Sequence, residues 1–262
     1  MSDSSIEVRR DGAVATVALN RPRSHNALTP EMITRLPHTL DELGRDEAVR
    51  VIVLTGNGRS FCAGADIDFM RQAADHSFEE NVAEGQAIFD LMQAVATCPR
   101  PVVGRVNGAA IGGGAGLVSC CDIVVAAVDA VFAFSEVRLG ILPAVISPFV
   151  VPRIGSSAAR ELFLTGERFD ARWAQRIGLV QHVATDEGAL DAMVSERVQQ
   201  LLQGAPQAQA EAKRLVANVL ARPAAELRSY TSRLIAERRA SDEGQEGMSA
   251  FLEKRKPWWQ ME

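Results

Sequence analysis

Four short apolar segments are spaced through the first half of the chain, and each has the composition of a buried strand. They are rich in valine and isoleucine, and glycine, proline, asparagine or aspartate, which favour turns, lie close to their ends. The segments are residues 14–19, 51–54, 102–106 and 123–126. We expect each to form a β-strand.

Longer segments with helical spacing of apolar residues lie between these strands. Thr29 followed by Pro30 has the form of an N-cap and a first helical position, and it predicts a helix to about Leu43 in which Pro37 can cause a kink. A second helix is predicted over residues 78–96, before a pair of prolines. Strands that alternate with helices indicate an α/β fold.

The composition changes after about Asp186. Alanine, leucine, glutamine and arginine dominate from there to the end of the chain, which predicts several helices and no strands. We therefore expect an α/β core over residues 1–190 and a C-terminal helical region over residues 191–262.

Composition and charge narrow the class of protein. The chain has 262 residues, of which 47% are hydrophobic, enough for one large core. No apolar run approaches the ~20 residues of a membrane span, and the first residues lack the pattern of a secretory signal, so we expect a cytoplasmic protein without a membrane partner. A net charge of −5 argues against nucleic acid as a partner.

Cysteine and histidine do not suggest a metal or a disulfide framework. The four cysteines form no CxxC pair, and the four histidines are scattered without an HExxH or comparable motif. We expect reduced thiols, no metal site and no separate cofactor.

The first segment with potential chemistry is residues 60–67, SFCAGADI, which follows a predicted strand. Small residues in such a place let the backbone approach a ligand closely. A simple junction between a loop and a helix would have the same composition, so these residues alone leave both interpretations open.

The second segment is residues 106–117, VNGAAIGGGAGL, in which a strand end is followed by consecutive glycines and an apolar helix. A helix that starts on glycine leaves its first N–H groups bare, and the helix dipole adds positive potential there. This arrangement suits an anion or an oxyanion. The glycines do not fit GxGxxG or a phosphate-binding loop, while tight packing of the helix on a sheet remains an alternative.

The third segment is residues 132–143, FAFSEVRLGILP, where Glu136 stands among apolar residues. A carboxylate that loses solvation has a raised pKa and becomes suited to proton transfer near neutral pH. An ion pair with Arg138 is the alternative. Because no GxSxG elbow is present, Glu136 is the best acid/base candidate.

Taken in order along the chain, these segments resemble the enoyl-CoA hydratase/isomerase (crotonase) family. The resemblance also includes LNRP, HNAL, LTGERF and the tail FLEKR, which are residues 19–22, 25–28, 164–169 and 251–255. It implies a spiral of ββα units, C-terminal helices that form a homo-trimer or hexamer, and an acyl-CoA thioester as substrate. Coenzyme A would then be part of the substrate rather than a cofactor.

The resemblance assigns roles to three residues. By position, the backbone N–H groups of Ala65 and Gly113 would bind the thioester oxygen, and Glu136 would move protons. Negative charge builds on that oxygen as an enolate forms, and preorganised donors act on this charge in the transition state.

One position departs from the family pattern. Family hydratases usually carry two glutamates, and the first aligns with Gly116. A single carboxylate suits a Δ3,Δ2-enoyl-CoA isomerase. However, residues 139–151 and 119–122 resemble the bacterial methylglutaconyl-CoA hydratase-like branch, which also tends to lack that first acid. Hydration of a 2-enoyl-CoA is therefore the leading hypothesis, with isomerisation and non-catalytic binding of acyl-CoA as alternatives.

The resemblance also implies a binding site for coenzyme A. Asp68 replaces a lysine that is common in the family, so Arg23 or Arg59 is a candidate for the phosphate contacts. Two residues of the tail, Phe251 and Lys254, would reach the site of a neighbouring subunit. The full set of expected substrate-binding residues is Arg23, His25, Ala27, Ala63, Asp66, Ile67, Asp68, Gly112, Gly116, Phe251 and Lys254.

Overall fold

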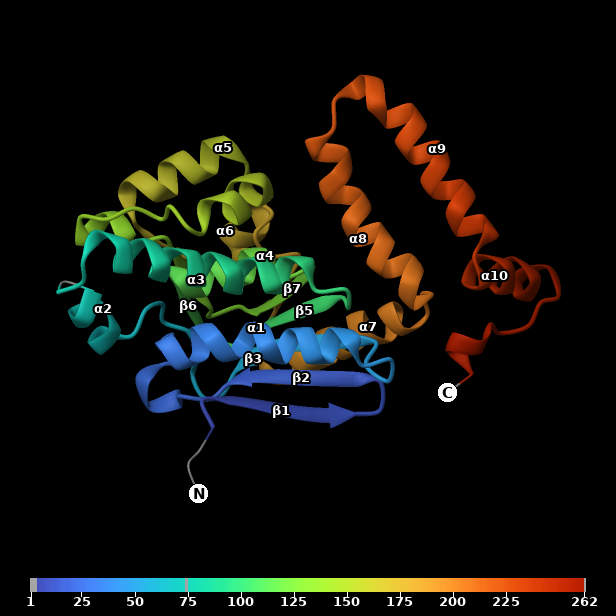
Figure 1. Ribbon diagram of the computed structural model, residues 1–262. Helices are drawn as coiled ribbons and strands as arrows, with labels where there is room; N and C mark the ends of the chain where they lie inside the picture. The colour runs from blue at the N-terminus through green and yellow to red at the C-terminus, as the bar shows by residue number, and fades with distance from the viewer. Residues whose placement is uncertain (1–3, 74, 262) are drawn as a thin grey trace.

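A six-stranded sheet forms the floor of the core in the computed structural model, which describes residues 4–73 and 75–261 (Figure 1). Its order is β1-β2-β3-β5-β7-β10, antiparallel between β1 and β2 and parallel elsewhere. The strands are β1 (Ile6–Asp11), β2 (Val14–Leu19), β3 (Val51–Gly56), β5 (Val102–Val106), β7 (Ile123–Ala127) and β10 (His182–Ala184). All four strands predicted from apolar segments are present in it.

A second, four-stranded sheet has the order β4-β6-β8-β9. Its strands are β4 (Ser60–Cys62), β6 (Ala109–Ile111), β8 (Val131–Ala133) and β9 (Arg168–Asp170). Each of β4, β6 and β8 directly follows a strand of the larger sheet and precedes a helix. The chain therefore repeats a ββα unit, which is the α/β spiral that the sequence resemblance implied.

The helices that complete these units cover the larger sheet. They are α2 (Ile67–Ala73) and α3 (Phe78–Thr97) after β4, α4 (Gly113–Cys120) after β6, and α5 (Ser147–Thr165) after β8. Figure 1 shows α3 running beside α1 (Pro30–Arg45) across one face of the sheet. The side chain of Thr29 caps α1 by accepting a hydrogen bond from the Met32 N–H at 3.3 Å, as the sequence predicted, and the helix continues through Pro37.

Two apolar clusters hold this arrangement together. The larger lies between the sheets and the helices α1, α3, α4 and α5, and the smaller lies on the other face of the sheet. In the smaller cluster, Leu190, Val194 and Val198 of α7 (Glu187–Leu202) pack on strands β3, β5 and β7. The division that we expected at residue 190 thus falls inside a helix that belongs to the core.

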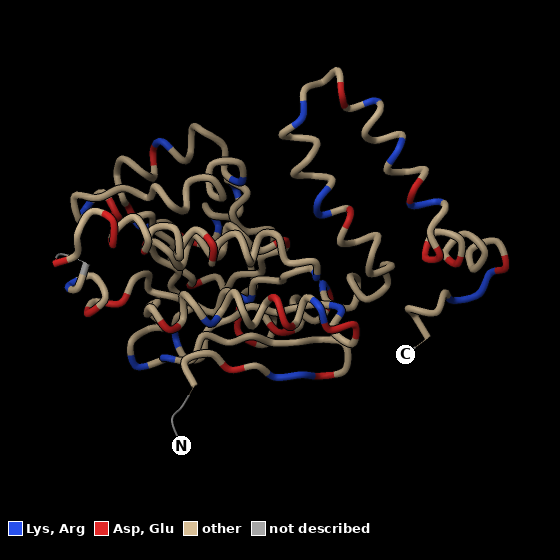
Figure 2. The backbone as a smooth tube through the Cα atoms, in the orientation of Figure 1, with Lys and Arg blue, Asp and Glu red and all other residues tan. Residues whose placement is uncertain are grey.

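Three helices after α7 extend away from the core, and we call them the arm. They are α8 (Pro206–Ala221), α9 (Ala224–Ala240) and α10 (Asp242–Leu252), and Figure 1 shows α9 and α10 well separated from the sheets. No residue of α8 or α9 is buried. Both basic and acidic positions lie along these two helices, and the basic ones are more numerous (Figure 2). The arm therefore contributes little to the core of its own chain.

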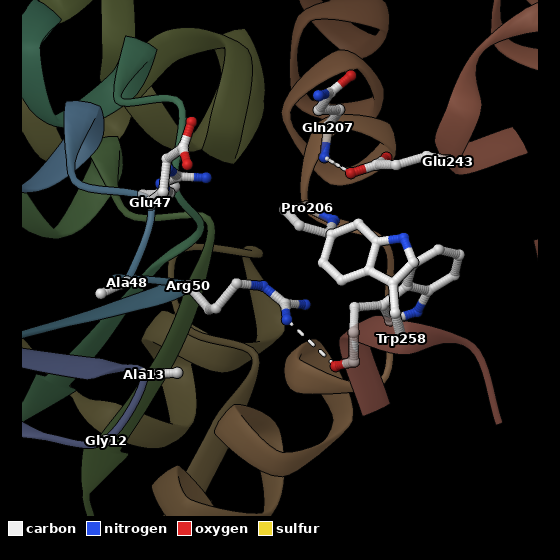
Figure 3. A pocket seen from close by; sticks show the side chains of 11 residues that line it. Gly12, Ala13, Glu47, Ala48, Arg50, Pro206, Gln207, Glu243 and Trp258 are labelled. Atoms are coloured by element: carbon white, nitrogen blue, oxygen red, sulfur yellow. Dashed lines mark hydrogen bonds between the residues drawn. The ribbon is translucent and has the colours of Figure 1, made fainter. Parts of the chain in front are cut away.

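Polar contacts fix the base of the arm. The Arg50 guanidinium donates to the backbone carbonyls of Gly204 at 2.6 Å and Trp259 at 3.3 Å. The buried Glu243 carboxylate accepts from the Gln207 N–H, as Figure 3 shows, and also from the Ala208 N–H. A pocket of about 550 Å³ lies between these groups. Both of these charged side chains thus bond to backbone groups where the arm joins the core.

Candidate active site

The loop after β4 presents a backbone N–H to a neighbouring cavity. Leu28 makes a parallel bridge to Ala65, in which its N–H donates to the Gly64 carbonyl at 2.7 Å and its carbonyl accepts from the Asp66 N–H at 3.0 Å. Leu28 thus bonds the residues on either side of Ala65. The N–H of Ala65 itself donates no hydrogen bond within residues 4–73 and 75–261.

Asp66 holds this loop in shape. Its carboxylate accepts from the Arg21 guanidinium at 2.8 Å and from the Asp68 N–H at 3.0 Å. The hydrogen bond from Arg21 lowers the pKa of Asp66, so the carboxylate stays ionised. Both contacts lie within the protein, so Asp66 helps to position this loop, and its predicted contact with the substrate stays a prediction.

The start of α4 supplies a second free N–H. Gly112 has φ 52° and ψ −119°, a conformation that L side chains rarely adopt, and its N–H donates to the Ala133 carbonyl at 2.8 Å. Gly113 is the first residue of the helix, where an N–H has no intrahelical acceptor. The two loops touch, because a Cβ added at Gly64 would lie 3.9 Å from the Gly113 nitrogen.

Glu136 lies opposite these groups, on the short 3-10 helix Glu136–Leu139 that follows β8. It is half-buried, and its Oε2 has no hydrogen-bond partner in the described part of the chain. Burial raises the pKa of the carboxyl. Arg138 does not pair with it, since its Nε donates to the Thr165 carbonyl at 3.3 Å. The alternative of a surface ion pair is therefore wrong.

One pocket of about 200 Å³ brings these three groups together. Ala65, Gly113 and Glu136 all line it. The remaining lining residues are apolar or small: Leu28, Ile33, Phe69, Ile88, Ile141, Leu142, Pro143, Ala144, Val145 and Ile146. Two N–H donors, one unpaired carboxyl and an apolar surround can stabilise an oxyanion and transfer a proton beside it.

Comparison with known proteins identifies the family. The sequence profile described as enoyl-CoA hydratase/isomerase matches residues 9–262. The chain belongs to the enoyl-CoA hydratase/isomerase family. The resemblance seen in the motifs is thereby confirmed.

Individual relatives of this family align over nearly the whole chain. The crotonyl-CoA hydratase of Syntrophomonas wolfei is 33% identical over 98% of both chains. The crystal structure of an enoyl-CoA hydratase from Shewanella pealeana has a TM-score of 0.94 at 38% identity, and covers 98% of this chain and 97% of that one. Pseudomonas aeruginosa AtuE also has a TM-score of 0.94, at 39% identity, and covers 98% and 99%. The spiral is thus the crotonase fold.

Gly116, which the resemblance aligns with the first glutamate of family hydratases, does not line the pocket. A Cβ added there would lie 2.5 Å from Ile146 Cγ2 and 3.2 Å from Met92 Cε. Both neighbours are buried. The family fold is therefore present here with one acid in the pocket, and an isoleucine stands where the side chain of residue 116 would begin.

The residues expected to bind coenzyme A lie around the two loops, with different degrees of exposure. Arg23 and Arg59 are exposed, whereas Ala27 is buried. Ile67 is exposed, and Asp68 pairs with Arg71 at 2.9 Å on the surface. His25 contacts the Ser60 hydroxyl through Nδ1 at 2.9 Å, and Ala63 is half-buried beside them, its N–H donating to the His25 carbonyl at 3.0 Å. These positions stay a prediction for the ligand.

Phe251 and Lys254 are not brought to the pocket within one chain. Phe251 is 82% exposed at the end of α10, and neither residue lines the cavity. Figure 1 places α10 on the opposite side of the molecule from α2. Their contact with coenzyme A stays a prediction.

The sequence reasoning overlooked Asn26. This residue is fully buried at φ 57°, and its side chain accepts from the Arg21 N–H at 2.8 Å and donates to the Asn57 and Ser60 carbonyls at 2.9 and 2.8 Å. It ties the HNAL loop to the loop before β4. An asparagine next to a predicted functional loop is a usable signal, because asparagine tolerates left-handed backbone better than most residues.

Neither a metal cluster nor a membrane span is found in the part of the chain that the structure describes. No group of three or more His, Cys, Asp or Glu residues there could hold a metal ion. None of the helices in residues 4–73 and 75–261 is long and apolar enough to cross a bilayer.

Proposed function

We propose that the protein hydrates a 2-enoyl-CoA with Glu136 as its single acid/base. The observation that supports this most directly is that Ala65, Gly113 and Glu136 line one cavity. In the proposed reaction the two N–H groups hold the thioester oxygen while water adds to the β-carbon. Glu136 takes a proton from that water and delivers one to the α-carbon, so it ends each cycle unchanged. Coenzyme A enters as part of the substrate, and these steps require no separate cofactor.

The pocket lining supports a short, uncharged acyl group. Glu136 is the only charged residue among the described residues that line it, and its volume of about 200 Å³ suits a short or branched hydrocarbon chain. The resemblance of residues 139–151 to the methylglutaconyl branch makes 3-methylglutaconyl-CoA a second candidate. Its terminal carboxylate would need a cation or hydrogen-bond donors for burial, which the lining side chains do not supply. We therefore favour the hydrocarbon substrate.

A double-bond isomerase is the second candidate. The observation that favours it is the apolar contact between Gly116 and Ile146, which leaves one carboxyl to serve both carbons. Removal of a proton from one carbon and its return to another needs only one such group. Both reactions share the oxyanion donors and differ in whether a water takes part.

A panel of substrates separates these proposals. Loss of the conjugated enoyl-thioester absorbance with crotonyl-CoA or 3-methylglutaconyl-CoA reports hydration, and gain of that absorbance with a 3-enoyl-CoA reports isomerisation. We expect crotonyl-CoA to be hydrated faster than 3-methylglutaconyl-CoA. Absence of both signals at high enzyme concentration would reject an enzymatic role and leave binding of acyl-CoA alone.

We also propose that the arm joins copies of this chain into a trimer or hexamer. An apolar groove between α8 and α9 supports this, since Leu215, Leu234 and Ile235 line a hollow of about 550 Å³ that opens to solvent. In such an assembly Phe251 and Lys254 could reach the coenzyme A of a neighbour. The catalytic residues would then lie in the core, and the C-terminal helices would make the contacts between subunits.

A further inference from the structure

Two glycines at the start of α4, its N-cap Gly112 and Gly116, lie against side chains that line the pocket. The Gly116 N–H donates to the Gly112 carbonyl at 3.0 Å, so the two residues are one turn apart on the same face. A Cβ at Gly112 would lie 3.2 Å from Glu136 Oε1, and a Cβ at Gly116 would lie 2.5 Å from Ile146 Cγ2. Glu136 and Ile146 are thus the neighbours of these two positions, and both line the pocket.

Ile146 is held firmly in that place. It is 3% exposed and precedes α5, and its carbonyl accepts from the N–H groups of Phe149 and Val150, each at 3.0 Å. Met92 closes the space behind it, because a Cβ at Gly116 would also be 3.2 Å from the Met92 methyl. A β-branched side chain has few rotamers with which to move aside. Even one methyl group at residue 116 thus forces Ile146 to shift.

We infer that Ile146 is a specificity-determining residue that sets the ratio of water addition to double-bond shift. Its side chain fills the space into which a side chain at residue 116 would extend, and it lines the same pocket as Glu136. A water in the active site needs two or more polar partners to be held in place. Ile146 offers it none, and Glu136 has the only polar side chain among the described residues that line the pocket. This inference rests on the proposed function.

Paired substitutions test the inference. Gly116→Glu alone should lower the melting temperature and leave the product ratio close to that of the wild type, because the new side chain meets Ile146. Gly116→Glu with Ile146→Ala should recover melting temperature relative to Gly116→Glu, and should raise the ratio of 3-hydroxyacyl-CoA to shifted enoyl-CoA by about tenfold or more. A positioned acid/base contributes about 10²–10⁴ to a rate, so a tenfold gain is a modest demand.

A second pair of substitutions, with smaller side chains, tests the same contact if the variant that combines Gly116→Glu with Ile146→Ala does not fold. Gly116→Ala adds only the clashing methyl, and Ile146→Ala removes the atom it meets. We expect the two changes together to cost less stability than the sum of the single changes, which a double-mutant cycle of thermal unfolding measures. Ile146→Ala alone serves as the control for enlarging the pocket without adding an acid.

The stabilities and product ratios of these variants support or overturn the inference. Coupled stabilities, and a raised ratio in the folded double variant that combines Gly116→Glu with Ile146→Ala, support the inference. Additive stabilities, a wild-type ratio in that folded variant, or an equal gain from Gly116→Glu alone would overturn it. Failure of the proposed function is distinct, because the wild-type protein would then catalyse neither water addition nor double-bond shift.

Discussion

At the scale of single residues, the proposed chemistry depends on the carboxyl of Glu136. Glu136→Gln keeps the shape of the side chain but removes its ability to exchange a proton, so we expect kcat to fall by about 10²–10⁴. Binding of coenzyme A should persist, because the Ala65 and Gly113 N–H groups are unchanged. Steady-state kinetics and equilibrium titration measure the two effects. The exposed Glu187→Gln is the matched control, and a Glu136→Gln variant within tenfold of wild type would show that another group transfers the proton.

The same carboxyl should make stability depend on pH. Burial raises the pKa of Glu136 above its ordinary value of 4.5, so the folded state binds a proton more tightly than the unfolded state does. Its contribution to stability is complete below the unfolded pKa and is lost as pH rises through the folded pKa. Glu136→Gln should therefore melt at a higher temperature than wild type near pH 8, with the gap closing near pH 4. Thermal unfolding across that range checks this, and a gap that widens toward acid would contradict it.

Gly113 offers a direct test of a backbone donor. Proline has no N–H and is tolerated at the first position of a helix, which Gly113 occupies. Gly113→Pro should lower kcat/KM by about 10²–10³, the typical effect of losing one oxyanion donor. Gly113→Ala adds a comparable Cβ, 3.3 Å from Leu28 Cδ1, but keeps the N–H, so it controls for the added bulk. Equal losses in both variants would mean that crowding, not the donor, limits the rate.

At the scale of elements, the sequence predicted some strands and helices and not others, and it missed β1 and α5 although they have six and nineteen residues. Strands β2, β3, β5 and β7 and helices α1 and α3 were found where apolar spacing, caps and prolines placed them. The strands β4, β6 and β8 have three residues each, too few positions for a period of two to be recognised. Their existence follows from pairing with one another, which is a property of the fold.

The residues of the candidate site also fall into two groups, those that the local sequence indicates and those that it does not. A glutamate in an apolar segment indicated Glu136 and a glycine run indicated the segment of Gly113, whereas the family resemblance selected Gly113 and Ala65 as the proposed donors. The contact between Gly116 and Ile146 joins α4 to the start of α5, and no local pattern reports which side chain fills the space over a glycine. The roles of Arg21 and Asn26 were also hidden, since their partners lie in other segments.

The cap on α8 gives a prediction for an element that has no buried face of its own. Glu243 lies in α10, yet its carboxylate accepts from two N–H groups in the first turn of α8, at 2.9 and 3.0 Å. Glu243→Gln keeps one acceptor and removes the charge that favours a helix N-terminus, so we expect unfolding to require about 1 kcal/mol less. Denaturant unfolding measures it. Glu237→Gln, at an exposed position, should change stability by less than about 0.5 kcal/mol. Equal losses of unfolding free energy in Glu243→Gln and Glu237→Gln would show that the cap does not stabilise α8.

At the scale of the whole molecule, the spiral explains why three distant segments meet. Each ββα unit places the end of its second strand at the smaller sheet, where β4, β6 and β8 lie side by side. The functional groups follow those strand ends, at Ala65, Gly113 and Glu136. The convergence is thus a consequence of repetition, and each unit supplies one part of the site.

The exposed apolar residues of the arm are expected to join copies of this chain in the proposed assembly. Leu220 on α8 and Ile235 on α9 are 76% and 50% exposed in a single chain, an arrangement that favours burial against another copy. Leu220→Glu with Ile235→Glu should convert the assembly to monomers, because two carboxylates would lose solvation in the interface. Light scattering and sedimentation report the mass, and circular dichroism should show that the helices persist. Val8→Glu, on the exposed edge of β1, is the control. A wild-type protein that is monomeric at all concentrations, or a charged variant of unchanged mass, would show that the arm has another purpose.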